Sequence, residues 1–297
     1  MAKKRDLVIG VIIIVSFLVF SLVMLFAFIG ISGQGEFSLA GMGKKVAIID
    51  LHGTITNSAD IIRQLKKYTK DSSIPAIVLD IDSPGGGVAP SQEIYEEIKK
   101  AKEKGKKIVA SMGSVGASGG YYVACAADTI IANPGTLTGS IGVIFQFPVA
   151  EELFKKIGLR FEVVKSGEFK DVGSSNRRMT EGERKLLQSV IDDTYGQFVE
   201  VLVESRKLSK EKALKLADGS IVTGRQAREL GLVDELGDLE DAIKIAGKMG
   251  GIEGPPNIIK EMRRKISLFE LLTQKMEELS KLNESEKFTP KLQYIFK

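Results

Sequence analysis

A serine flanked by glycines is the chain's clearest candidate nucleophile. Residues 116–120 read Gly-Ala-Ser-Gly-Gly, and a glycine-rich strand-to-helix turn is the setting in which a catalytic hydroxyl stands clear of its neighbours. A nucleophilic serine needs a base, most often histidine. The only histidine, His52, precedes Ser118, whereas hydrolases built on a G-x-S-x-G turn place the histidine after the serine. A lysine base is therefore favoured, as in the serine–lysine variant of nucleophilic catalysis.

A lysine acts as a base only when its amine is neutral. A free lysine has a pKa near 10.4, and lowering it to about 7 takes roughly 4–5 kcal/mol, which burial can supply and solvent exposure cannot. Most lysines, such as those in 99–107, lie on predicted solvated helix faces. Lys165 and Lys170 instead follow an apolar strand and flank Phe169. Asp171 counts against Lys170 because a nearby carboxylate favours the charged amine, and the local sequence leaves both lysines open.

Two further turns of small residues could complete the site. Residues 83–87, Ser-Pro-Gly-Gly-Gly, follow a buried strand, and consecutive glycines let backbone amides face a ligand. They predict either an oxyanion hole or a tight turn, and no Gly-Lys-Ser/Thr follows to make a P-loop. Since both glycine turns end successive parallel strands, they should meet at one sheet edge, where ligand sites of α/β sheets form. In the turn 136–142, Ser140 could hold a neutral lysine in place.

The elements that must position these turns follow from the hydrophobic pattern. Short β-branched runs alternate with amphipathic stretches, which predicts an α/β domain with a largely parallel sheet. We expect strands at residues 46–51, 76–81, 107–112 and 129–132, and helices at 59–68, 90–104, 180–206, 210–217, 224–230 and 239–249. Glycines and prolines then break the chain, and apolar spacing predicts an amphipathic helix over 258–282.

An uncharged apolar segment at residues 7–31 is long enough to cross a bilayer. It exceeds the apolar core of a cleaved signal peptide, so we expect an uncleaved anchor. Basic residues precede it, which predicts a cytoplasmic N-terminus and an extracytoplasmic catalytic domain at the cell membrane. The expected organisation is a cytoplasmic N-terminus at 1–6, the transmembrane anchor at 7–31, a linker at 32–44, the catalytic domain at 45–249, and a C-terminal helix and tail at 250–297.

The composition excludes several classes of protein. A net charge of +4 over 297 residues is too small for a nucleic-acid footprint. A single cysteine excludes an internal disulfide, and one cysteine with one histidine excludes a Cys/His zinc site. We therefore expect neither a metal nor another cofactor.

Four motifs, in this order, resemble the signal peptide peptidase A family in its short form with one catalytic domain. They are Ser-Pro-Gly-Gly-Gly at 83–87, Ala-Ser-Gly-Gly-Tyr-Tyr at 117–122, Leu-Thr-Gly-Ser-Ile-Gly-Val at 137–143 and Lys-Ser-Gly-x-x-Lys-Asp at 165–171. The resemblance covers roughly residues 45–247. It implies a fold like that of Clp protease and the crotonases, a spiral of ββα units, here preceded by one transmembrane helix.

Carried over motif by motif, the resemblance implies a serine–lysine dyad. Ser118 is then the nucleophile, Lys170 the general base, and Ser140 the residue that positions the lysine. The implied oxyanion donors are the amides of Gly119 and of either Gly85 or Gly86. Family members form ring-like homo-oligomers and degrade cleaved signal peptides and other short or unfolded apolar peptides, so a membrane serine endopeptidase of this kind is the expected function.

Three alternatives stay open at this point. A crotonase-like acyl-CoA enzyme shares the implied fold, but it is expected in the cytoplasm and usually carries an acid–base carboxylate. A related membrane serine protease that processes a stomatin-like partner would differ in the peptides that it cuts. A catalytically inactive membrane scaffold would use the predicted C-terminal helix to bind its partner.

Overall fold

The computed structural model describes residues 16–21, 43–261 and 293–295, and the chain divides into two units between Met42 and Gly43. In the first unit, residues 16–21 are helical and the side chains from Phe17 to Phe20 are exposed. Within the described ranges, no helix combines the length and apolarity that a bilayer crossing needs. Most of the expected anchor at 7–31 lies outside those ranges, so the anchor stays a prediction.

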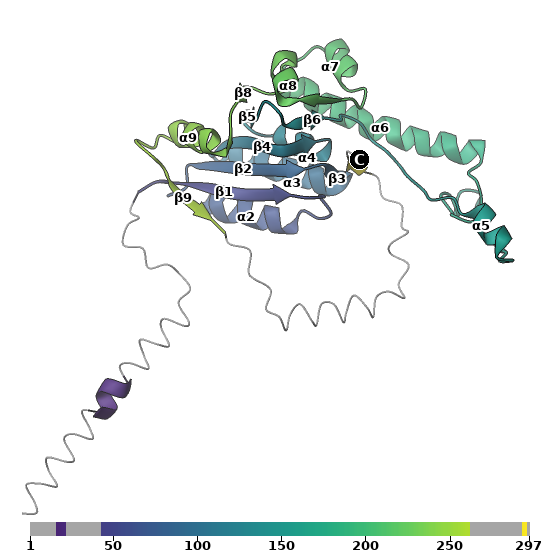
Figure 1. Cartoon of the computed structure of the whole chain (residues 1–297), viewed down its shortest axis with the longest axis horizontal. Coiled ribbons are helices and arrows are strands. Elements are labelled where there is room, and N and C mark those ends of the chain that lie inside the picture. Colours follow the sequence, from purple (N-terminus) through teal and green to yellow (C-terminus); the bar gives the residue numbers. More distant parts are fainter. Residues whose placement is uncertain (1–15, 22–42, 262–292, 296–297) are drawn as a thin grey trace, which may run out of the picture. The chain divides into compact units, whose positions relative to one another are not determined.

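An eight-stranded sheet forms the centre of the second unit (Figure 1). Its main path runs β7-β6-β4-β2-β1-β9, with β5 beside β4 and β8 beside β5. The strands are β1 (Lys45–His52), β2 (Ala76–Ser83), β4 (Lys107–Ala117), β5 (Thr129–Ala132), β6 (Leu137–Gly139), β7 (Ile221–Thr223), β8 (Glu235–Leu236) and β9 (Asn257–Lys260). Every pair is parallel except β6 with β7. The predicted α/β domain with a largely parallel sheet is confirmed.

Helices cover both faces of this sheet because alternate strand residues point to opposite sides. Ile49 and Leu79 pack in one apolar cluster with six helices, whereas Ile48 and Val78 pack in a second cluster. The helices of the first cluster are α2 (Ala59–Lys70), α3 (Val88–Glu103), α4 (Gly119–Ala124), α6 (Glu181–Arg206), α7 (Lys210–Leu216) and α8 (Gly224–Leu230), and α9 (Leu239–Met249) closes the second. The remaining labelled helix is α5 (Glu151–Lys156). The six helices predicted before residue 250 begin and end within two residues of their expected bounds.

The helix predicted over 258–282 is wrong at its start. Residues 257–260 form strand β9, which pairs in parallel with Lys45–Ile48 of β1. Ile258 and Ile259 are β-branched, and without β9 the strand β1 would be an unpaired edge of the sheet, so strand pairing overrides the helical spacing. The rest of that predicted helix, from residue 262, lies outside the described residues.

Strand β4 carries the chain from the core to the serine turn. Its first half pairs with β5 at Val109–Met112, and its second half pairs with β6 at Val115–Ala117. Ser83 of β2 lies in register with Gly116 of β4, so the two glycine turns meet at one sheet edge, as the sequence predicts. We call the edge where β1, β2 and β4 end the carboxyl edge.

Gly120 tests this close approach between α4 and β2. A Cβ at Gly120 would lie 2.8 Å from the carbonyl oxygen of Ser83, so we expect Gly120→Ala to lower the free energy of unfolding by about 1–3 kcal/mol. Gly196, inside α6, is the matched control because nothing lies within 4 Å of the place that its Cβ would take. There alanine should raise the free energy of unfolding by about 0.5–1 kcal/mol. Thermal unfolding that moves in the same direction for both variants would contradict this account of the turn.

Candidate active site

Ser118 has a backbone conformation that few residues other than glycine adopt. Its φ is 52° and its ψ is −116°, a strained combination of the kind that persists where the surroundings enforce it. The Ser118 N–H donates to the carbonyl oxygen of Gly139 at 2.9 Å, and the Ser118 carbonyl accepts from the N–H of Tyr122 at 2.8 Å. Bonds to β6 on one side and to α4 on the other therefore hold the serine in its turn.

The Ser118 hydroxyl is buried and, among the described residues, has no hydrogen-bond partner. The residue is 1% exposed. Leaving a buried hydroxyl unpaired costs about 1–3 kcal/mol. It follows that neither His52 nor Lys170 forms a hydrogen bond with the Ser118 hydroxyl within a single chain.

Strand β6 and the turn after it support the turn that contains Ser118. The buried Thr138 donates its hydroxyl to the carbonyl oxygen of Gly116 at 2.6 Å. Ser140 directly follows Gly139, the acceptor of the Ser118 N–H, and its own N–H donates to the carbonyl oxygen of Ser220 at 2.7 Å. The structure thus brings Ser140 beside the serine turn, and its predicted role in positioning the lysine stays a prediction. The bond from Thr138 was not foreseen, although the density of hydroxyl residues in this turn was its signal.

The glycine turn lies beside the serine turn as a short strand, β3 (Gly85–Gly87). The Ile55 N–H donates to Gly85, and Ile55 accepts from the Gly87 N–H, at 2.9 and 2.8 Å. A Cβ at Gly86 would lie 2.2 Å from the Ile55 carbonyl oxygen, so only glycine fits there. The Gly85 N–H donates to the Ser83 hydroxyl at 3.2 Å.

Strand β3 also accepts a strand from the far end of the chain. β10 (Gln293–Ile295) pairs with it in antiparallel fashion, with Tyr294 opposite Gly86 (Figure 1). Because Ile55 uses the groups of Gly85 and Gly87, the backbone N–H and carbonyl of Gly86 face the other way, toward β10. β3 therefore has a second side that takes up an extended chain.

No lysine or arginine lies in the four segments that build the carboxyl edge. Residues 50–60, 80–93, 113–120 and 133–142 contain five acidic residues and one histidine, but none of the two basic types. A lysine base for Ser118 must therefore come from outside these segments.

The motif that carries the predicted base lies at the N-terminal end of α6. Asp171 is ion-paired with Lys165 at 2.5 Å and with Arg177 at 2.9 Å, and Arg177 also binds Glu183. Arg177, with Lys165, holds the pKa of Asp171 well below its usual range, and the hydrogen bonds from Arg177 lower the pKa of Glu183 to about 2. Lys165 is occupied by this ion pair. Lys170 is exposed and, among the described residues, has no ion-pair partner.

Within one chain, Lys170 and Ser118 are separated by much of the length of α6. Tyr122, one helical turn after Ser118, packs against Phe198 with ring centroids 5.0 Å apart. Glu183, tied to the lysine motif, precedes Phe198 by fifteen residues of α6, which is roughly 22 Å at 1.5 Å per residue. Figure 1 shows α6 running from beside α4 out to α5. A single chain therefore does not bring the two predicted catalytic residues together.

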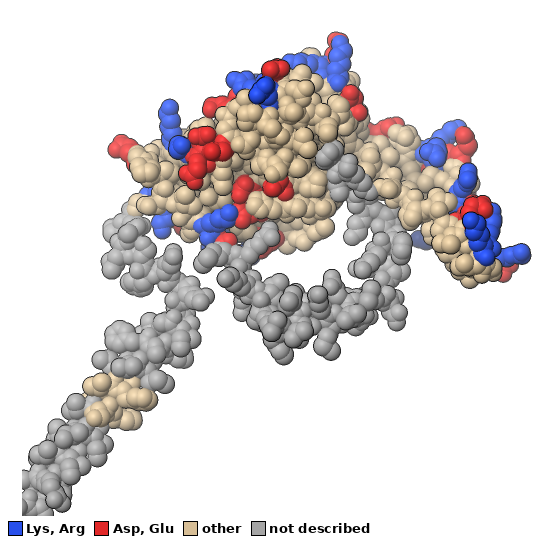
Figure 2. Space-filling model, viewed as in Figure 1, with Lys and Arg blue, Asp and Glu red and all other residues tan. Residues whose placement is uncertain are grey.

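We call residues 143–180, which lead to this motif, the arm. Its surface is unusually apolar for an exposed segment, and Figure 2 shows charges of both signs gathered over α5 beside uncharged surface. The exposed apolar side chains of the arm are Ile144, Val149, Leu153, Ile157, Leu159, Phe161, Val163, Val164 and Phe169. An exposed apolar surface of this extent marks an interaction site.

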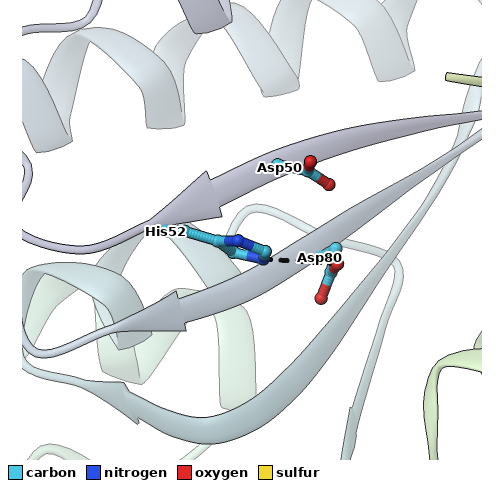
Figure 3. Close-up of side chains that lie close together, drawn as sticks. All are labelled: Asp50, His52 and Asp80. Carbon is cyan, nitrogen blue, oxygen red and sulfur yellow. Dashed lines mark ion pairs between the residues drawn. The ribbon is translucent and has the colours of Figure 1, made fainter. Parts of the chain in front are cut away.

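A second polar cluster lies on β1 and β2 (Figure 3). Asp50 and His52 occupy alternate positions of β1, and Asp80 of β2 lies opposite Asp50. His52 Nε2 is 3.3 Å from Asp80 Oδ2, and burial raises the pKa of Asp80. The three side chains have a spacing that metal ligands adopt, but Lys260 Nζ lies 2.7 Å from Asp50 and 4.0 Å from Asp80. The Lys260 ammonium already offsets the charge of one of the two carboxylates, so we assign no metal to the cluster. The period-two spacing of Asp50 and His52 was the sequence signal for it.

Two profiles of known protein families match the chain. Peptidase family S49 matches residues 100–252, and Clp protease matches residues 35–136. The second match agrees with the α/β fold and the mixed sheet described above. The fold expected from the four motifs is therefore confirmed as Clp protease-like.

Several relatives carry the names of proteases. A protein of Synechocystis sp. that is named as a candidate protease is 46% identical over 211 residues, which cover 71% of this chain and 76% of that protein. Protease 4 of Haemophilus influenzae is 35% identical over 214 residues, covering 69% of this chain and 35% of the relative. An Enterococcus faecium protein named as a candidate signal peptide peptidase SppA is 38% identical over 187 residues, covering 63% and 54%.

The strain at Ser118 predicts different stabilities for two variants that both lack the hydroxyl. Glycine adopts the observed φ and ψ without strain, whereas alanine retains the Cβ that makes them costly. We expect Ser118→Gly to be more stable than Ser118→Ala by about 1–3 kcal/mol, as measured by thermal unfolding of the two variants. A Ser118→Gly variant that is no more stable than Ser118→Ala would show that the turn is not strained in solution.

Proposed function

The chain belongs to peptidase family S49 and is a serine peptidase, and we propose that it is a membrane-anchored endopeptidase with a dyad of Ser118 and Lys170. Its proposed substrates are cleaved signal peptides and other short or unfolded apolar peptides. The observation that carries the proposal is the state of Ser118. Its backbone is strained, and its buried hydroxyl has no hydrogen-bond partner among the described residues of one chain. A nucleophile held in that state awaits both a base and a substrate.

The base is proposed to come from a neighbouring copy of the chain. The carboxyl edge has no lysine or arginine in its four segments, and Lys170 lies at the other end of α6. Of the two lysines in the motif, Lys170 is the one available as a base, because Lys165 is ion-paired with Asp171, as is Arg177. In a ring of copies related by rotation, the arm of one copy reaches the carboxyl edge of the next, and each site joins residues of two chains.

The apolar arm supports this assembly. Side chains such as Phe161 and Val164 would be costly to leave in water, and packing them against a second copy removes them from it. The same contact would bury Lys170 beside Ser118, where loss of water favours the neutral amine that a general base requires. Ser140 directly follows the acceptor of the Ser118 N–H and is the proposed acceptor of a hydrogen bond from that amine.

The proposed reaction is acyl transfer. Lys170 takes the hydroxyl proton as Ser118 Oγ attacks the peptide carbonyl carbon, and the ammonium returns that proton to the leaving amine as the peptide bond breaks. The oxyanion accepts from the N–H of Gly119, which as the first residue of α4 has no intrahelical acceptor. The second donor is proposed to be the N–H of Gly85 or of Gly86; within one chain the first donates to the Ser83 hydroxyl and the second faces β10. Water, deprotonated by the same lysine, then hydrolyses the acyl-enzyme.

An extended peptide is the substrate that the glycine turn fits best. β3 takes β10 as an antiparallel partner, and a peptide substrate would add to it by the same backbone hydrogen bonds. The glycines leave little room for bulky groups, since Gly86 is packed directly against Ile55. We therefore infer a preference for small side chains beside the scissile bond. The apolar segment at 7–31 would hold this site at the membrane, on its outer side.

Labelling of Ser118 with a fluorophosphonate tests the dyad. The full chain should react at Ser118, and Lys170→Ala should slow that reaction by roughly 100-fold or more, because a general base contributes about 10²–10⁴. Modification is measured by mass spectrometry of the intact chain and its peptides. The labelling rate should rise with pH in the wild type, since only the deprotonated amine can take the proton.

The matched control is Lys212→Ala, which removes an exposed lysine of α7 and should leave the rate unchanged. Equal labelling of Lys170→Ala and the wild type would reject Lys170 as the base. A wild-type chain that resists labelling at Ser118 while cutting peptides would reject Ser118 as the nucleophile.

A further inference from the structure

The sheet edge opposite the carboxyl edge is strongly basic. Because β1, β2 and β4 are parallel, α2 and α3 both return the chain to the edge where these strands begin. The three segments there, 43–45, 66–76 and 99–107, hold eleven lysines and only two acidic residues. We call this surface the basic edge.

The three segments form one continuous surface. The Lys45 N–H donates to the carbonyl oxygen of Ser73 at 2.7 Å, and the Lys107 N–H donates to that of Pro75 at 3.0 Å. The buried Lys106 amine donates to the carbonyl oxygen of Ile74 at 2.6 Å, which ties the third segment to the second. The lysines therefore act together and not as separate charged loops.

Most of this positive charge faces solvent. Lys102 and Lys106 are used within the fold, the first in an ion pair with Asp128 at 3.3 Å and the second by carbonyl oxygens. Six exposed lysines of the basic edge have no carboxylate within 4.0 Å among the described residues: Lys44, Lys66, Lys70, Lys100, Lys104 and Lys107.

Helix dipoles explain only part of the pattern. Lysines near the C-termini of α2 and α3 offset the negative ends of those helices. Lys44, Lys45, Lys106 and Lys107 instead stand at the starts of β1 and β4, where strands have only small net dipoles. Their charges add to those at the helix ends, and helix dipoles do not account for them.

The opposite edge has the opposite sign. Residues 50–60 and 80–93, at the carboxyl edge, hold five acidic residues and no lysine or arginine. Positive charge is therefore concentrated at one end of the strands, and the acidic residues lie at the other, where Arg63 and Lys260 offset part of their charge. A charge separation of this kind orients a molecule in the field of a charged surface.

The proposed anchor enters the domain at the basic edge. Residue 31 ends the apolar segment and Lys44 opens the basic edge, so the twelve residues between them allow a separation of at most about 45 Å when fully extended. Within that reach, the basic edge is the part of the catalytic domain that the chain connects most directly to the bilayer. This inference rests on the proposed membrane anchor.

We propose that the basic edge binds the head groups of anionic phospholipids and holds the catalytic domain on the membrane surface. The carboxyl edge, with Ser118, then points away from the bilayer, because it lies at the other end of the same strands. Each lysine near an anionic membrane strengthens binding by about fivefold, so six exposed lysines suffice to hold a domain that is already tethered.

Lysine acetylation of the full chain in lipid nanodiscs tests this proposal. The chain is placed in discs of phosphatidylcholine alone and in discs that also contain phosphatidylglycerol, and the acetylation rate of each lysine is read by mass spectrometry. Lys66, Lys70, Lys104 and Lys107 should react at least about fivefold more slowly in the anionic discs. High salt should remove the difference, because it screens exposed charges.

Two lysines of α7, Lys212 and Lys215, serve as internal controls and should react equally in both discs. The double variant Lys104→Glu with Lys107→Glu should abolish the protection of Lys66 and Lys70, whereas Lys212→Glu with Lys215→Glu should preserve it. Equal acetylation of the basic edge in both lipids overturns the proposal. The proposal is also overturned if a soluble polyanion protects the same lysines from acetylation equally well in discs without anionic lipid, because the basic edge would then bind an acidic macromolecule.

This experiment separates the inference from the function on which it rests. A chain that fails to remain in discs of either lipid would refute the anchor and, with it, this inference. A chain that remains in both discs with equally reactive lysines would refute the basic edge alone, and labelling of Ser118 would still decide the peptidase mechanism.

Discussion

One constraint dominates this structure: the turn from β4 to α4 holds Ser118 in a strained backbone and buries its hydroxyl, which has no partner in the part of the chain that the structure describes. A buried, unsatisfied oxygen is costly, and so is a serine with a φ of 52°. The surrounding fold holds the turn in this state through the hydrogen bonds of Ser118 with Gly139 of β6 and Tyr122 of α4, and through the close contact of Gly120 with β2. A second copy that brings Lys170 is the proposed complement of this hydroxyl.

The parallel sheet gives its two edges different chemistry. At the carboxyl edge, glycine turns expose backbone amides, and lysine and arginine are absent from the segments that form it. At the opposite edge, returning helices and strand starts collect lysines. Because the carboxyl edge has no lysine or arginine in its segments, a base from a second copy is proposed for it. The basic edge, beside the residues that lead to the proposed anchor, suits a membrane surface. The two proposals thus follow from one topological fact, the parallel order of β1, β2 and β4.

Much of the core could be predicted from the sequence because its signals are local. β-branched runs gave β1, β2, β4 and β5, and the order of the glycine turns predicted that Ser118 and Gly85 share an edge, which the register of Ser83 with Gly116 confirms. Residues 257–260 were missed because their helical spacing competes with an unpaired edge of β1, which is visible only in three dimensions. The pairing of β10 with β3 joins segments some two hundred residues apart and leaves no local pattern. The position of Lys170 at the far end of α6 depends likewise on the length of that helix and on the ion pairs of Arg177.

Mixing two inactive variants tests the central claim most directly. Ser118→Ala retains the lysine and Lys170→Ala retains the serine, so co-assembly in equal amounts builds some sites with an intact pair from two chains. If the dyad joins neighbouring copies, the mixed assembly should recover about a quarter of the wild-type peptidase activity, while each variant alone stays inactive. A mixed assembly of folded chains that shows no activity would contradict the account, since it would mean that serine and lysine must belong to the same chain.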